Sequence, residues 1–163
     1  PEIFPAITVL SHLVHHVLAL PVLLVASVVS AVAGWHPFPW TFVLLPVALV
    51  PWVLLAGGIS FAVSALAVHF RDLRDLLGHL LNLLFFASPI IYSLDGLELP
   101  PVLHATLVLN PLAPLVTVFR DCAFTGRVSG PGIWAAAFGF SLLAWWAGTR
   151  LFDHYRDTLV EAV

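Results

Sequence analysis

The chain has 163 residues, of which 61% are hydrophobic and 9% are Asp, Glu, Lys or Arg. Soluble domains contain about 45–50% apolar and about 25% charged residues, so this composition predicts an integral membrane protein. All six basic residues are arginines, and the absence of lysine excludes a Walker A phosphate loop, while the net charge of −3 argues against nucleic-acid binding. The single cysteine, Cys122, excludes an intrachain disulfide and a zinc site built from cysteines.

Stretches without charge mark the expected membrane spans. No Asp, Glu, Lys or Arg occurs between Ile3 and Phe70. A spanning helix needs about 20 residues, so this stretch predicts two spans joined by a turn. Residues 34–40 contain glycine, proline and two tryptophans, which favour a turn at the membrane interface. Along the whole chain the pattern predicts four spans, at residues 13–33, 41–68, 76–92 and 132–152.

The segment between the third and fourth spans has a different character. It is free of charge from Leu99 to Phe119, but four prolines interrupt it: Pro100, Pro101, Pro111 and Pro114. Because proline breaks helices and lipid does not tolerate exposed backbone, residues 99–126 are expected to form a re-entrant helical hairpin that turns near Asn110-Pro111. The predicted fold class is an all-α integral membrane protein with four transmembrane helices plus this hairpin, in a single transmembrane domain over residues 1–163.

Four spans place both termini on one side of the membrane, together with a polar elbow at residues 69–75. Four of the six arginines fall on that side, so the positive-inside rule predicts cytoplasmic termini. The chain begins at Pro1 rather than Met, so we expect it to be part of a longer protein. Small residues at four-residue spacing on the second span predict close helix packing, within the chain or against another subunit. These residues are Ala56, Ser60 and Ser64, and Gly58 and Ala62.

Three histidines form the first candidate site. His12, His15 and His16 share one helical face, a spacing that can hold a metal ion or a haem. The zinc-protease motif also needs a Glu, which is missing between these histidines. Since they flank a span rather than occupy its centre, we favour uncharged interfacial histidines. A haem- or metal-binding membrane protein that uses this face is the alternative.

The polar elbow is a second candidate site. Its Arg71-Asp72 and Arg74-Asp75 pairs repeat at a spacing of three residues, which places them on one face of a short helix. The pattern fits a self-paired, solvated turn and a docking site for a cytoplasmic partner equally well.

Charges near the opposite membrane face are a third candidate. They are Asp95, Glu98, Arg120, Asp121 and Arg127. Charges at membrane depth are costly, which makes them candidates for function. For Arg120-Asp121 we favour an interfacial over a buried pair.

Aromatic side chains at the outer end of the third span are a fourth candidate. Phe85, Phe86 and Tyr92 are expected there, where they either line a path for sugar rings or face lipid and core. No stretch of the sequence resembles a Ser-His-Asp or paired-carboxylate catalytic set. We therefore predict no enzyme active site in this chain.

The order of three sequence blocks points to a known family. Phe70-Arg71-Asp72-Leu73-Arg74, followed by Leu84-Phe85-Phe86-Ala87-Ser88-Pro89-Ile90-Ile91-Tyr92, resembles the permease subunits of type-2 ABC exporters. The resemblance is closer to the branch that exports polysaccharides such as O-antigen and teichoic-acid chains. Leu109-Asn110-Pro111-Leu112-Ala113-Pro114, then Phe119-Arg120-Asp121 and Gly126, is similar to the next block of that family. The opening Pro1-Glu2-Ile3-Phe4-Pro5-Ala6 is similar to the end of its cytoplasmic coupling segment.

The resemblance implies a transport subunit with no cofactor of its own. The family has six spans per permease, so the four expected here imply that the first two are missing. Two permease copies pair as a homodimer to form a channel, and separate ABC ATPase subunits bind below and hydrolyse ATP. The cargo is a lipid-linked glycan that crosses the bacterial inner membrane. A drug or small-lipid exporter of the same superfamily is the alternative, although the Ser-Pro-Ile-Ile-Tyr block favours glycans.

The resemblance also suggests roles for individual residues. Those expected to couple the permease to the ATPase are Glu2, Phe4, Arg71, Asp72, Arg74 and Asp75. Those expected at the channel or its outer gate are Phe85, Phe86, Tyr92, Asn110, Arg120 and Asp121.

Overall fold

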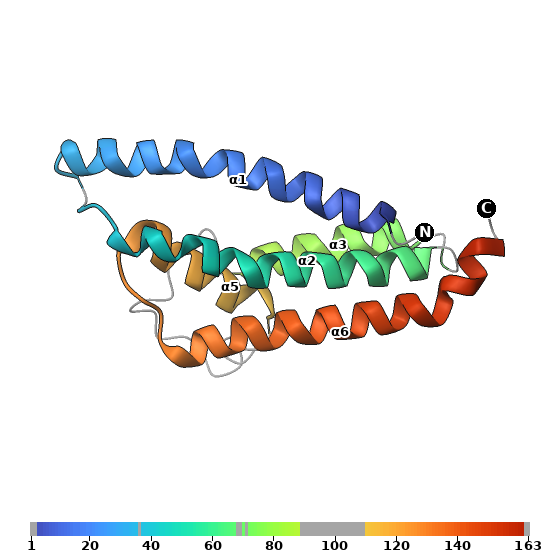
Figure 1. Cartoon of the computed structure of the whole chain (residues 1–163). Coiled ribbons are helices and arrows are strands. Elements are labelled where there is room, and N and C mark those ends of the chain that lie inside the picture. Colours follow the sequence, from blue (N-terminus) through green and yellow to red (C-terminus); the bar gives the residue numbers. More distant parts are fainter. Residues whose placement is uncertain (1–2, 36, 68–69, 71, 89–109, 162–163) are drawn as a thin grey trace.

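The computed structural model describes residues 3–35, 37–67, 70, 72–88 and 110–161, and these residues form an all-helical structure. Three long helices, α1, α2 and α6, run along the molecule, and two shorter ones, α3 and α5, lie beside them (Figure 1). A 3-10 helix, η1, precedes α2, and a π-helix, η2, follows α5. The bounds are α1 Ile3–Val32, η1 Trp40–Leu44, α2 Leu45–Ala67, α3 Leu73–Ala87, α5 Leu112–Arg120, η2 Asp121–Thr125 and α6 Pro131–Glu161.

The two ends of the molecule carry different parts of the chain (Figure 1). The start of α1, the end of α2, the start of α3 and the end of α6 lie at one end, which we call the terminal end. The α1–α2 and α5–α6 connections lie at the opposite end, which we call the distal end. The first and last helices therefore start and finish on the same side, as predicted, and residues 72–75 of the elbow lie with them.

The turn between α1 and α2 forms as the sequence predicts. Gly34 has a positive φ of 74°, which favours glycine. The amides of Gly34 and Trp35 donate to the carbonyls of Ala31 and Ser30 at 3.1 and 3.0 Å, the Schellman arrangement that ends helices. Trp35 and Trp40 are 75% and 81% exposed, as expected for side chains that anchor at a membrane interface.

The helices match the predicted spans to different degrees. Two stretches, Ile7–Val32 and Trp40–Ala67, are long and apolar enough to cross a bilayer, and they overlap the first two predicted spans. Helix α3 begins earlier than the predicted third span and has 15 residues, so it covers about 22 Å against a bilayer core of about 30 Å. Residues 89–92 of that predicted span lie outside the described residues.

Helix α6 is longer than the predicted fourth span, with 31 residues. The helix continues through charged residues to Glu161, which places Trp145 and Trp146 near its middle. Its tryptophans, glycines and charged last part lower its mean hydropathy below that of α1 and α2. Among the described residues, only the stretches in α1 and in η1–α2 are long and apolar enough to cross a membrane as a single helix.

The core forms where α2 packs closely against α6 and α5. Glycines make the α2–α6 contact possible: a Cβ atom on Gly58 would overlap the Ala144 backbone, and one on Gly148 would overlap the Gly58 backbone. The predicted close approach of small residues is thus confirmed for Gly58, within the chain. The fully buried residues around this contact include Leu45, Ala48, Leu115, Val118, Cys122, Ala123 and Ala137.

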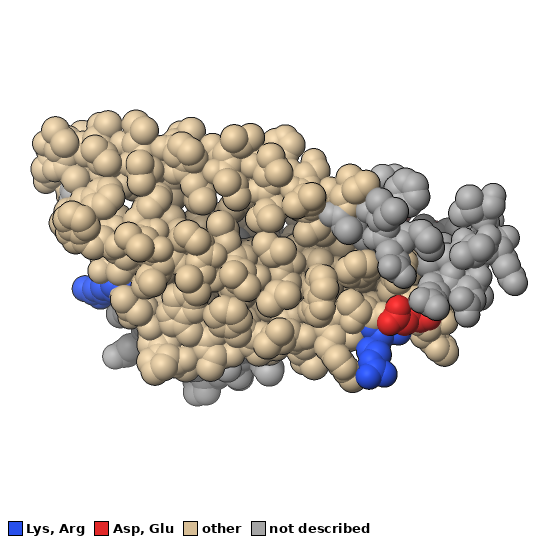
Figure 2. Space-filling model, in the orientation of Figure 1, with Lys and Arg blue, Asp and Glu red and all other residues tan. Residues whose placement is uncertain are grey.

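The surface is suited to an apolar environment. On the face seen in Figure 2, the described charged side chains lie at the two ends, and none lies in the long stretch between them. No residue in the most apolar part of α1 is buried inside the structure. An exposed apolar surface of this extent requires lipid or other protein around it.

Candidate functional site

The first part of the candidate site is a buried polar contact between the end of α3 and the start of α5. Asn110 is only 4% exposed, and its Nδ2 atom donates to Ser88 Oγ at 2.9 Å. Ser88 Oγ in turn donates to the Leu84 carbonyl at 2.6 Å, and Asn110 Oδ1 accepts the Leu112 amide at 2.9 Å. Because every one of these groups has a partner, the pair tolerates burial. It also starts α5 with a side-chain cap.

The two described prolines of this segment, Pro111 and Pro114, stand at the start of a helix rather than interrupt one. Pro111 immediately precedes α5, and Pro114 lies in its first turn. The first amides of a helix have no partner within the helix, so proline costs little there. The predicted change of direction near Asn110-Pro111 therefore coincides with a helix start, while residues 99–109 of the predicted hairpin lie outside the described residues.

The second part of the candidate site lies at the distal end and joins η1 to η2. The Thr41 hydroxyl lies 3.0 Å from the Cys122 carbonyl and 3.3 Å from the Asp121 carbonyl, so it donates to the backbone of η2. The Asp121 carboxylate accepts the Ser129 hydroxyl at 2.7 Å. Gly126 ends η2 with a φ of 68° and packs against Pro39. We call the six residues Pro39, Thr41, Asp121, Cys122, Gly126 and Ser129 the distal junction.

Two ionisable groups of this region have contrasting surroundings. Arg120 is half-buried, and its fully buried Nε atom has no hydrogen-bond partner among the residues that the structure describes. Cys122 is 0% exposed, and burial, with a smaller contribution from the Asp121 carboxylate, raises the pKa of its thiol. A buried thiol with a raised pKa stays protonated and unreactive, so Cys122 fills the core rather than performing chemistry.

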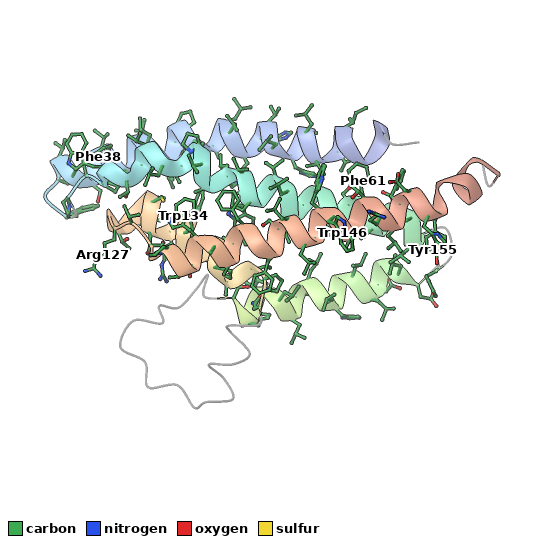
Figure 3. The ribbon with its side chains drawn as sticks, turned by 60° about the horizontal axis from the view of Figure 1, so that its bottom comes forward. Phe38, Phe61, Arg127, Trp134, Trp146 and Tyr155 are labelled. Atoms are coloured by element: carbon green, nitrogen blue, oxygen red, sulfur yellow. The ribbon has the colours of Figure 1, made fainter. Side chains whose placement is uncertain are left out.

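The residues expected at the channel fall in separate places. Phe85 and Phe86 lie in the last turns of α3, 42% and 68% exposed, with their ring centroids 5.6 Å apart. Arg120 is the last residue of α5 and Asp121 follows it, and the nine residues of this helix cover about 13 Å. The structure brings Asn110 close to the end of α3 but not to the Arg120-Asp121 pair, and Tyr92 lies outside the described residues. Arg127 is exposed at the distal end (Figure 3).

The residues expected to couple to an ATPase are at the terminal end where the structure describes them. Asp72 precedes α3 and Asp75 lies in its first turn, and both are exposed. An acidic residue in the first turn interacts favourably with the helix dipole. Arg74 belongs to the same turn and Phe4 to the first turn of α1. Glu2 and Arg71 lie outside the described residues.

The histidines of α1 contact their own helix and α5. His15 Nδ1 lies 2.8 Å from the Ser11 carbonyl, and the His16 ring packs edge-on against Phe119 at 5.7 Å. His12 and His16 line an apolar groove of about 500 Å³ between α1, α2 and α3, beside Trp52. Among the described residues, no three His, Cys, Asp or Glu side chains lie close enough together to hold a metal ion.

Sequence reasoning did not find three polar residues of this site. Thr41 and Ser88 each make a hydrogen bond to a distant part of the chain, and Ser129 makes one to Asp121, eight positions earlier. Thr41 is separated from Cys122 by 81 positions. A local pattern contains no signal for such a pairing, although the position of Ser88 and Ser129 beside helix ends is typical of side chains that satisfy free backbone or polar groups.

Comparison with known proteins places this architecture in a family. Residues 4–124 match the family described as ABC-2 type transporter. The chain is 28% identical over 162 residues to the O-antigen export system permease protein RfbA of Myxococcus xanthus, covering 99% of this chain and 61% of that protein. It is 25% identical over 128 residues to a protein of the same name from Klebsiella pneumoniae, covering 78% of this chain and 48% of that protein. The chain therefore spans less than two thirds of the length of these relatives, and it belongs to the ABC-2 type transporter family of integral membrane permeases.

Proposed function

We propose that this chain is the C-terminal membrane part of a permease subunit that exports a lipid-linked polysaccharide across the bacterial inner membrane. ATP hydrolysis is supplied by a separate ABC ATPase subunit. The observation that carries this proposal is the similarity of 99% of the chain to a protein named as an O-antigen export permease. The lack of lysine agrees with it, because a chain without lysine has no Walker A motif of its own.

The proposed topology has four spans with both termini in the cytoplasm. Helices α1 and α2 each cross the membrane as one continuous helix. Helix α6 also crosses it, with its charged last turns in the cytoplasm. Helices α3 and α5 follow one another along the long axis of the molecule (Figure 1), so we propose that α3 enters from the cytoplasm and that α5 is the second arm of the re-entrant segment at 99–126. The terminal end is then cytoplasmic, the distal end faces outward, and residues 1–163 form one membrane domain.

At the cytoplasmic end, the elbow and the start of the chain act as the docking surface for the ATPase. The exposed carboxylates of Asp72 and Asp75 support this role, because both are open to a partner at the end where α1 begins. The residues proposed to contact the ATPase are Glu2, Phe4, Arg71, Asp72, Arg74 and Asp75. Movement of the ATPase is transmitted through α3, whose first turn holds two of these residues.

At the outer end, the re-entrant segment acts as the gate of a channel formed with a second permease copy. The polar Ser88–Asn110 contact divides the α3–α5 path at a point where the two helices meet, so the outer part can change position while α3 stays in place. The buried Arg120 Nε atom, to which no described residue bonds, supports a role for the outer part in binding or gating, because such groups are costly unless they serve a function. The residues proposed for this path are Phe85, Phe86, Tyr92, Asn110, Arg120 and Asp121.

The double substitution Arg71→Glu with Arg74→Glu tests the coupling role in the full-length permease with its ATPase. We expect coupled ATPase activity and polysaccharide export to fall by about tenfold or more, because reversed charges repel a complementary surface. Both rates are measured in reconstituted membranes. Arg150→Glu is the matched control, since Arg150 is exposed near the same end and stacks on Trp146 of its own helix at 5.5 Å.

Two results test the coupling role of the elbow and the transporter class. If the double variant exports at the parent rate, the elbow does not couple the permease to the ATPase. A mild-detergent purification of the full-length protein tests the transporter class itself. An ATPase subunit with a Walker A motif, present in stoichiometric amount, is expected; its absence would contradict the proposed function.

A further inference from the structure

The segment that follows α5 has an unusual backbone geometry. Residues Asp121–Thr125 form a π-helix, in which hydrogen bonds run from residue i to i+5. Single π-turns are rare in proteins, and those that occur are often found at functional sites. Cys122 and Ala123 within the turn are 0% exposed and belong to the same core as Leu45. The π register therefore determines which residues of this turn face the core.

The turn is held from two sides. Thr41 donates its single hydroxyl proton to the backbone side, where the Cys122 and Asp121 carbonyls lie 3.0 and 3.3 Å away. On the other side, Ser129 donates to the Asp121 carboxylate at 2.7 Å. Thr125 adds a bond within the turn, to the Asp121 carbonyl at 3.1 Å. Thr41 thus connects the α1–α2 connection directly to η2.

A change from π to α register would alter this arrangement. A π-turn contains one more residue than an α-turn, and one residue corresponds to about 100° of rotation in an α-helix. A change to the α register would therefore rotate α5 by about that angle relative to the chain that follows the turn. Cys122 would leave the core, and Arg120 would point in another direction. The hydroxyl of Thr41 opposes this change, because its acceptors are the carbonyls of the turn itself.

We propose that Thr41 is a positioning residue that holds residues 121–125 in the π register and so sets the direction of Arg120 and Asp121 at the distal end. This inference rests on the proposed role of Arg120 and Asp121 at the outer gate. It adds that the gate is attached to the α1–α2 connection, so that a movement of α1 and α2 reaches the gate through the distal junction.

The experiment uses the full-length permease with its ATPase in lipid nanodiscs and measures how fast N-ethylmaleimide modifies Cys122, read on the peptide that contains it. Thr41→Val keeps the shape of the side chain and removes the donor. We expect labelling about three- to tenfold faster than in the parent, the range given by losing one ordinary hydrogen bond. Thr41→Ser restores the hydroxyl and is expected to label at the parent rate.

Thr149→Val is the matched control. The Thr149 hydroxyl donates only within α6, to the Trp145 and Trp146 carbonyls at 2.9 and 3.1 Å. Its loss is expected to leave Cys122 labelling unchanged. Ser129→Ala provides a second test of the same turn and is expected to speed the labelling of Cys122 as well. It can be measured even if Thr41→Val does not assemble. Parent-like labelling in Thr41→Val, or in Ser129→Ala if only that variant assembles, would overturn the proposal.

A second measurement separates this inference from the proposed function. We expect Thr41→Val to lower the amount of polysaccharide exported per ATP hydrolysed, while a merely destabilised protein loses both rates together and keeps their ratio. Thr41→Ser is expected to restore the ratio. If labelling rises and the ratio stays at the parent value, Thr41 holds the turn but the turn is not the gate, which contradicts the gate assignment alone.

Discussion

Helices α1 and α2 are both long and strongly apolar, yet they are packed in opposite ways. None of the apolar stretch of α1 is buried, whereas 39% of the corresponding stretch in α2 is buried. Leu18 and Val22 on α1 are 66% and 71% exposed, while Leu45 and Ala65 on α2 are 1% and 0% exposed. Hydropathy alone does not distinguish these helices.

The difference comes from the shape of the helix surfaces. In lipid, two apolar faces gain little from leaving an equally apolar solvent, so close contact depends on small residues that let backbones approach. Helix α2 has Gly57 and Gly58 at such a point, facing Trp145 and Ala144 of α6. The outward face of α1 is covered with valine and leucine side chains and remains available to lipid or to other protein.

The largest effect is expected where the two backbones meet. A side chain at position 148 has no space, because even a Cβ atom would overlap the Gly58 backbone. We expect Gly148→Leu to destabilise the subunit by about 3 kcal/mol, near the upper end for overpacked sites. The free energy of unfolding is measured by titration with a denaturing detergent.

The same substitution at Gly139 is the control for this test. Gly139 lies on the same helix, and a Cβ atom there would meet nothing within 4 Å. Gly139→Leu is expected to be nearly neutral, since it removes a flexible residue from a helix and adds an apolar side chain to an open surface. Equal losses at positions 139 and 148 would show that α6 does not depend on the glycine contact with α2.

A smaller effect is expected at the buried polar contact between α3 and α5. Asn110→Leu removes the bonds to Ser88 and to the Leu112 amide. We expect a loss of about 2 kcal/mol, because buried polar groups are left without a partner. Asn82→Leu, at an exposed position of α3, is the control in the same unfolding measurement. Similar stability of Asn110→Leu and the parent would contradict the structural role of Asn110.

The helices that could be predicted best are those with continuous local signals. The first two spans follow from uninterrupted apolar residues that end at a glycine turn, and Gly34 forms the expected helix end. The helices that hold the third and fourth expected spans extend beyond the expected bounds, α3 at its start and α6 at its end. Helix α3 starts at Leu73 because Asp75 suits a first turn, and α6 continues past Phe152 because its charged residues remain helical outside an apolar layer.

The interactions between distant segments could not be predicted. Proline as a helix breaker predicts an interruption at Pro111 and Pro114, but Pro111 immediately precedes α5 and Pro114 lies in its first turn, positions that the sequence pattern does not specify. The contact of Thr41 with Cys122 depends on the approach of η1 to η2 in three dimensions. Of the predicted site residues, Asn110 gained a structural explanation through Ser88 and Leu112, and Asp121 through Ser129.

The smallest effect is expected on α1, where two adjacent residues offer a direct test of the comparison. Val22 is 71% exposed, whereas Leu23 packs against the core. We expect Val22→Ala to change the free energy of unfolding by less than about 0.5 kcal/mol and Leu23→Ala by about 1 kcal/mol, below the range for fully buried leucines. Both are measured in the full-length permease in lipid. If Val22→Ala costs as much as Leu23→Ala, the outward face of α1 packs against protein rather than lipid, because only a protein surface fails to fill the space of the lost methyl groups.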